Sequence, residues 1–206
     1  MTLTQPTYIL RRVATLLSIA ILTLCLMAAI TGTLLSFYYE PTATGAHASL
    51  EFITNDVHHG WLIRTVHNVA GNVVVVLGLI QLVVLFFSRC LQPAWVTAWV
   101  SGVTFTLSAI GLGWTAMILD WSQVGYWRLK VELGTIAAIP VIGSQIQTLL
   151  TGGGFGSMTI QRMYTLHSYV LAIVAVTLAA IHLISLLQQE RRLNTPTADK
   201  IASQVS

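Results

Sequence analysis

Residues 162–182 read RMYTLHSYVLAIVAVTLAAIH, an apolar run that carries His167 near one end and His182 near the other. The run continues to Gln189, which gives more than the ~20 apolar residues that a helix needs to cross a bilayer. On an α-helix, fifteen residues rise about 22 Å and make a little over four turns, so both imidazoles lie on roughly one face. The stretch therefore predicts a membrane helix with histidines at two depths.

A histidine inside a bilayer needs a partner, because an unpartnered ionisable side chain is costly to bury there. One alternative is a hydrogen bond to a neighbouring helix. The other is a metal, since imidazole is a common ligand of haem iron. A second histidine at the same depth on a second helix would favour haem.

The composition is that of an integral membrane protein. Of 206 residues, 55% are hydrophobic and 8% are charged, whereas soluble domains carry about 25% charged residues. The net charge is only +3, and no basic patch with interleaved aromatic residues predicts a nucleic-acid partner. Cys25 and Cys90 lie far apart in the sequence, which indicates buried thiols rather than a metal site.

Four apolar runs predict an all-α membrane protein, a bundle of four transmembrane helices that can hold haem. The expected spans are 13–39, 61–87, 95–119 and 162–189. The first run is far longer than the apolar core of a signal peptide, which favours a span over that alternative. Residues 121–161 predict one or two interfacial helices and a glycine turn. We expect one membrane domain, residues 1–190, and a polar cytoplasmic tail, residues 191–206.

Basic residues beside the spans indicate the orientation of the chain. One side carries Arg11, Arg12, Arg89, Arg191, Arg192 and Lys200. The other side carries Arg64, Arg128, Lys130 and Arg162, together with most of the acidic residues. Both termini are therefore expected to be cytoplasmic. His47, His58 and His59 fall outside the spans and are expected to be solvated or interface residues rather than ligands.

The second span supplies the second histidine. His67 lies six residues inside Trp61, and His167 lies five inside Arg162. Because the second and fourth spans run in the same direction, these histidines lie at similar depth. This favours a haem whose iron is a metal centre held by His67 and His167, with Arg64 and Arg162 placed to meet its propionates.

Several motifs carry a family resemblance. They are FYYEPT (37–42), GWLIRTVH (60–67), SQVGYW (122–127), AIPVIGS (138–144) and RMYTLHSY (162–169). These motifs resemble those of the cytochrome b6 family, the four-span haem subunits of cytochrome b6f complexes, and the resemblance covers residues 22–184. The chain also resembles the N-terminal half of cytochrome b in bc1 complexes, but four spans and the fifteen-residue histidine spacing fit the b6 type better.

The resemblance implies two stacked b haems, each held by one histidine from the second span and one from the fourth. The outer pair matches as His67 and His167. The inner pair should be His182 and the residue fourteen beyond His67, but that position is Gln81, and an amide is not a usual haem ligand. We therefore expect one outer haem b and a hydrogen bond between Gln81 and His182. A haem held by His182 alone is the alternative.

Other differences from the family accompany Gln81. Leu16 stands where the family attaches a third haem to cysteine, and residues 187–188 (Leu-Gln) replace a basic pair. Four glycines let haem approach the backbone in the family. Gly32 and Gly102 match them, whereas Ser18 and Ala116 occupy the other two positions.

The resemblance implies an electron carrier of a quinol-oxidising b6f- or bc-type chain, in a thylakoid or bacterial plasma membrane. The 206 residues contain no counterpart of the second half of cytochrome b, so catalysis would require a subunit-IV-like protein and a Rieske iron–sulfur protein as partners. Two alternatives stay open. One is a stand-alone single-haem protein, either a quinone-linked redox protein or a sensor, and the other is a non-redox structural subunit of a membrane complex.

Overall fold

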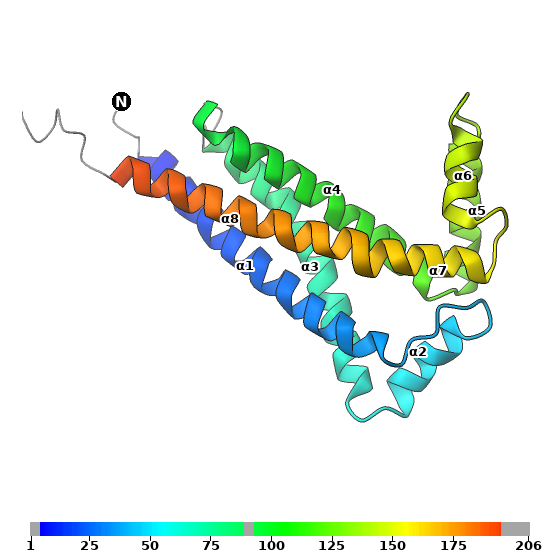
Figure 1. The fold of residues 1–206 in the computed structure, drawn as a ribbon. Coiled ribbons are helices and arrows are strands. Elements are labelled where there is room, and N and C mark those ends of the chain that lie inside the picture. The colour runs from blue at the N-terminus through cyan, green and yellow to red at the C-terminus, as the bar shows by residue number, and fades with distance from the viewer. Residues whose placement is uncertain (1–4, 89–92, 195–206) are drawn as a thin grey trace, which may run out of the picture.

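The computed structural model describes residues 5–88 and 93–194. The helical elements are α1 (Gln5–Ser36), α2 (Ala46–Asn55), α3 (Gly60–Phe87), the short 3₁₀ helix η1 (Pro93–Trp95), α4 (Val96–Leu119), α5 (Gln123–Ala137), α6 (Gly143–Thr151), α7 (Ser157–Thr165), the π-helical turn η2 (Leu166–Leu171) and α8 (Ala172–Asn194). Helices α7 and α8 and the turn between them form one continuous rod (Figure 1).

Four stretches of the described chain are long and apolar enough to cross a membrane. They are Tyr8–Ser36, Gly60–Phe87, Pro93–Leu119 and Ser157–Arg191. The predicted four-span bundle is thereby confirmed, and the chain is an integral multi-pass membrane protein. The boundaries differ from those expected, since α1 already begins at Gln5 and the fourth span begins at Ser157.

The spans pack as a ring in which α1 contacts α3 and α8, and α4 contacts α3 and α8. The core at mid-bundle is built from α1, α3, α4 and α8, with Ile21, Val74, Phe105 and Ala175 all buried. Small residues such as Ala175 let membrane helices approach closely. The ring brings side chains of α3 and the fourth span toward one another, which is the arrangement that a shared site requires.

Helices α2, α5 and α6 lie at the end of the bundle opposite the N-terminal end of α1, and α5 and α6 run across the bundle axis (Figure 1). Ser122 caps α5 by accepting a hydrogen bond from the Gly125 N–H. Gly152, at a φ of +75°, ends α6 in the left-handed conformation that glycine adopts without strain. The connection thus contains two helices, where one or two were expected, and the glycine turn.

Two further expectations concern the cysteines and the C-terminal tail. Cys25 is buried as a free thiol, as expected, whereas Cys90 lies outside the described residues. Helix α8 continues to Asn194, beyond the expected boundary at residue 190. The remainder of the expected tail, residues 195–206, lies outside the described part.

Candidate functional site

His67 on α3 and His167 on η2 face one another across the bundle. Their ring centres are 6.3 Å apart and their planes are inclined by 58°. A metal–imidazole bond is about 2 Å long, as at zinc, so two imidazoles on opposite sides of one metal have ring centres about 6 Å apart. The observed separation therefore fits one metal atom between these rings.

Both rings are held through Nδ1. His67 Nδ1 lies 3.0 Å from the Ala28 carbonyl oxygen, and a carbonyl can only accept, so Nδ1 carries the proton. His167 Nδ1 lies 2.9 Å from Thr115 Oγ1, whose own hydroxyl proton is donated to the Gly111 carbonyl. Each Nε2 is left with a lone pair, and such contacts orient metal-binding imidazoles.

Gly32 on α1 lies against the His67 ring. A Cβ added at this position would lie 2.9 Å from His67 Cε1 and 3.3 Å from its Nδ1. The absent side chain therefore makes room for the imidazole beside the α1 backbone. Gly32 therefore lies in direct contact with the His67 imidazole.

The donor set suits haem better than a bare metal ion. Among residues 5–88 and 93–194, no group of three or more His, Cys, Asp or Glu side chains could hold a metal ion. Haem brings its own ring nitrogens and takes only axial ligands from the protein. Two facing imidazoles with free Nε2 atoms, beside a glycine on the neighbouring helix, fit that requirement.

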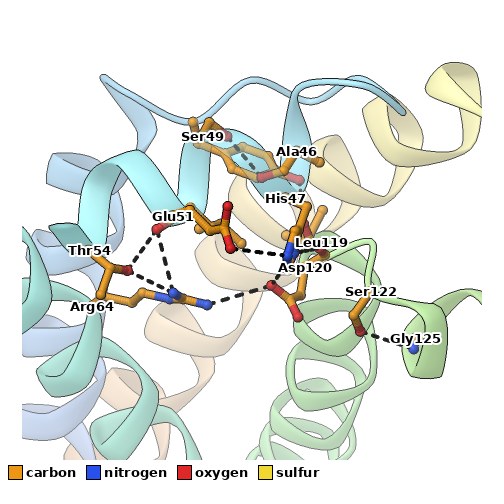
Figure 2. A network of polar contacts seen from close by, with 12 residues as sticks. Ala46, His47, Ser49, Glu51, Thr54, Arg64, Leu119, Asp120, Ser122 and Gly125 are labelled. Atoms are coloured by element: carbon orange, nitrogen blue, oxygen red, sulfur yellow. Dashed lines mark hydrogen bonds and ion pairs between the residues drawn. The ribbon is translucent and has the colours of Figure 1, made fainter. Parts of the chain in front are cut away.

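Arg64 lies one turn before His67 and joins a polar network outside the bundle core (Figure 2). Its Nη1 donates to Thr54 Oγ1 at 2.8 Å, and its Nη2 lies 3.6 Å from Asp120 Oδ1. His47 also contacts Asp120 at 3.6 Å and Glu51 at 3.7 Å. Arg64 is thus a positive charge near the site, held in this structure by α2 and the end of α4.

Arg162 contacts the end of α6 in this structure. Its guanidinium donates to the carbonyls of Thr148, at 2.9 Å, and Leu149 at the C-terminal end of α6. Cations are favourable at such helix ends. The contact fixes α6 to α7, and a role of Arg162 toward a propionate stays a prediction.

The Gln81–His182 pair lies at the other depth. The Gln81 amide donates to His182 Nε2 at 2.9 Å and to the Ala14 carbonyl at 3.1 Å. His182 Nδ1 lies 2.8 Å from the Ala98 carbonyl and 3.3 Å from Ser101 Oγ, so Nδ1 is protonated and Nε2 accepts. The predicted hydrogen bond between Gln81 and His182 is confirmed.

This pair leaves no space for iron between its members. One metal atom bonded to both side chains would need their donor atoms about 4 Å apart, whereas the two nitrogens are 2.9 Å apart. Gly102 contacts the His182 ring in the same way that Gly32 contacts His67, with an added Cβ 2.9 Å from Cε1. The two imidazoles thus have similar settings, but Nε2 of His182 accepts a hydrogen bond from Gln81.

The positions that differ from the family are placed as follows. Leu16 is 66% exposed and points out of the bundle, whereas Ser18 is buried and its hydroxyl has no partner among the described residues. Ala116 is exposed, and it is Thr115 that contacts His167.

Sequence reasoning did not find the groups that orient the histidines. They are the Ala28 and Ala98 carbonyls, Thr115 and Ser101. Backbone carbonyls carry no signal in a sequence. Thr115 and Ser101 were detectable only as polar residues in an apolar span.

Comparisons with known proteins identify the family. The model of the family described as cytochrome b/b6/petB matches residues 5–190. The chain belongs to the cytochrome b/b6 family. Cytochrome b6 of Synechocystis sp. is 36% identical over 82% of this chain and 76% of its own length. Cytochrome b6 of Mesostigma viride is 34% identical over 80% of this chain and 77% of its own length.

A chain of a hyperthermophilic respiratory complex III has the same fold. Its TM-score is 0.73 at 21% identity, over 84% of the present chain. The present chain spans about half, 47%, of that chain. At this identity the likeness supports the arrangement of the spans alone.

Proposed function

We propose that this chain is a haem b membrane electron-transfer protein that binds one haem between His67 and His167. The observation that carries the proposal is the facing pair of imidazoles, whose ring centres are 6.3 Å apart. Membership of the cytochrome b/b6 family supports haem b as the group that they hold. Bound haem would supply a one-electron couple at its iron.

The protein's own residues would hold and orient that group. His67 and His167 offer Nε2 because the Ala28 carbonyl and Thr115 bind the opposite ring nitrogens. Gly32 leaves the space in which the His67 ring stands. Arg64 provides a positive charge one turn away, suited to a propionate.

We infer one haem per chain because the Gln81 amide is hydrogen-bonded to Nε2 of His182. A haem at His182 would first have to displace the amide from Nε2. It would also leave one N–H of the Gln81 amide without its partner in the core, since Gln81 is only 2% exposed. The hydrogen bond itself is worth only about 0.6 kcal/mol in a membrane. The cost of leaving a buried N–H without a partner therefore contributes more to excluding haem than the bond does.

The family context supports a place in a quinol-oxidising b6f- or bc-type chain, with a subunit-IV-like protein and a Rieske protein as partners. Both termini would be cytoplasmic, in a thylakoid or bacterial plasma membrane. A second candidate, a stand-alone single-haem redox protein, is favoured by the Gln81–His182 pair. That pair removes the second haem that would continue an electron path across the bilayer.

Purification from native membranes tests these functions. The reduced protein should show a low-spin b-type spectrum that His67→Ala and His167→Ala each abolish. The matched control is His58→Ala, which removes an exposed histidine outside the spans. An unchanged spectrum in both ligand variants would refute the assignment. Copurifying Rieske and subunit-IV-like proteins would support the complex, a haem-bearing single chain the second candidate, and absence of haem a structural role.

A further inference from the structure

The two helices that carry the paired side chains have unequal spacings. Gln81 lies fourteen residues beyond His67, whereas His182 lies fifteen beyond His167. Both pairs nevertheless meet, at 6.3 Å between ring centres and 2.9 Å between nitrogens. On straight α-helices the additional residue would turn one partner by about 100° and shift it about 1.5 Å. The fourth span must therefore contain a local change of helix geometry that accommodates the additional residue.

The π-helical turn Leu166–Leu171 lies inside the longer interval and includes His167. The Ala172 N–H donates to the His167 carbonyl, which is the i to i+5 pattern of a π turn. One such wide turn holds one residue more than the α-helical turn that it replaces. Helix α3 is α-helical over its whole interval, from Gly60 to Phe87.

The positions of the core-facing residues in the fourth span also indicate one additional residue. Met163, Ala175 and Ala179 are each at most 2% exposed. Leu171 packs against α4, since a Cβ added at Gly111 would lie 3.2 Å from Leu171 Cδ1. With His167 these positions follow one another at steps of four residues. Each such step drifts by about 40° on an α-helix. One additional residue in the π turn offsets about 100° of the accumulated drift, so His167 and Ala179 both face the bundle.

We propose that the π turn is the positioning element of the haem site. It holds the surplus residue of the fourth span, and thereby brings His167 opposite His67 while His182 stays opposite Gln81. His167 itself would be the ligand. The π turn acts through His167, because it holds the one residue by which the fourth span exceeds the matching interval on α3. This inference rests on the proposed function where it concerns haem, whereas its statement about helix register does not.

Deleting one residue on each helix tests the proposal. Deletion of Val170, which is 49% exposed in the π turn, shortens the spacing of the two histidines from fifteen positions to fourteen and permits a straight α-helix. The control is deletion of Val76, which is 54% exposed on α3, where no wide turn can absorb the change. The readouts are helix content by circular dichroism, haem stoichiometry and the low-spin spectrum.

We expect the Val170 deletion to keep the helix content, the haem and the low-spin spectrum of the wild type. The Val76 deletion should lower haem occupancy at least about tenfold, since weaker second-shell changes already cost 10- to 100-fold in metal affinity. A Val170 deletion that unfolds, or that folds and loses low-spin haem, contradicts the proposal. So does a Val76 deletion that keeps it. Absence of haem from the wild type would instead refute the proposed function, and helix content alone would then test the register.

Discussion

Replacing Gly32 with alanine should weaken haem binding, because the new methyl group and the His67 ring compete for the same space. The added Cβ would lie 2.9 Å from His67 Cε1, whereas carbon atoms pack best at about 3.5–4.0 Å. The ring must move away from α1, which lengthens its 3.0 Å hydrogen bond to the Ala28 carbonyl. Overpacking of this kind costs about 1–3 kcal/mol. Since 1.4 kcal/mol is a factor of ten, we expect about 5- to 140-fold weaker binding.

Titration of the haem-depleted protein with haem, followed in the Soret band, measures this change. Gly71→Ala on α3 is the matched control, because an added Cβ there meets no atom within 4 Å. Gly102→Ala produces the same 2.9 Å contact with His182 and should lower the thermal midpoint without changing haem affinity. If Gly32→Ala binds haem as tightly as Gly71→Ala, the inferred position of the ligand ring is incorrect.

Three other substitutions test separate parts of the molecule. Gln81→His should add a second low-spin haem by pyridine haemochrome, and no gain would mean that the space has been filled. Arg64→Gln should lower the haem's reduction potential or occupancy in a redox titration, and if neither changes, the arginine is only an interfacial anchor. Burial would raise the pKa of Glu132, but hydrogen bonds from Arg128 and Trp114 outweigh it and leave that pKa lowered. A lowered carboxyl pKa stabilises the fold above about pH 4.3, the unfolded value. This stabilisation is lost as the pH falls through the folded pKa. Hydrogen exchange in α5 should therefore rise at acid pH, and Glu132→Gln should remove the dependence. Equal pH dependence in both proteins would contradict the assignment.

The pairing of His67 with His167 could be predicted from the depth of each residue in the membrane. The positions of His67 and His167 relative to the span ends sufficed to pair them. Depth is a property of a single helix, so it can be obtained from the sequence. The family motifs added the expectation for the inner pair.

The remaining features depend on contacts between helices, which spacing alone does not specify. The carbonyl partners of the histidines come from α1 and α4 and have no residue-type signature. The partner of Arg162 is the end of α6, whose position follows from the fold of the connection. The π turn was detectable in principle, since a fifteen-residue spacing opposite a fourteen-residue one requires a register change.

The number of haems per chain tests the central claim most directly. A pyridine haemochrome assay on the purified wild-type protein, with protein quantified by amino-acid analysis, measures it. The account predicts about one low-spin haem b per chain and little response to carbon monoxide, because His182 is bonded to Gln81. Two haems per chain, with a carbon-monoxide-sensitive component that His182→Ala removes, would contradict it.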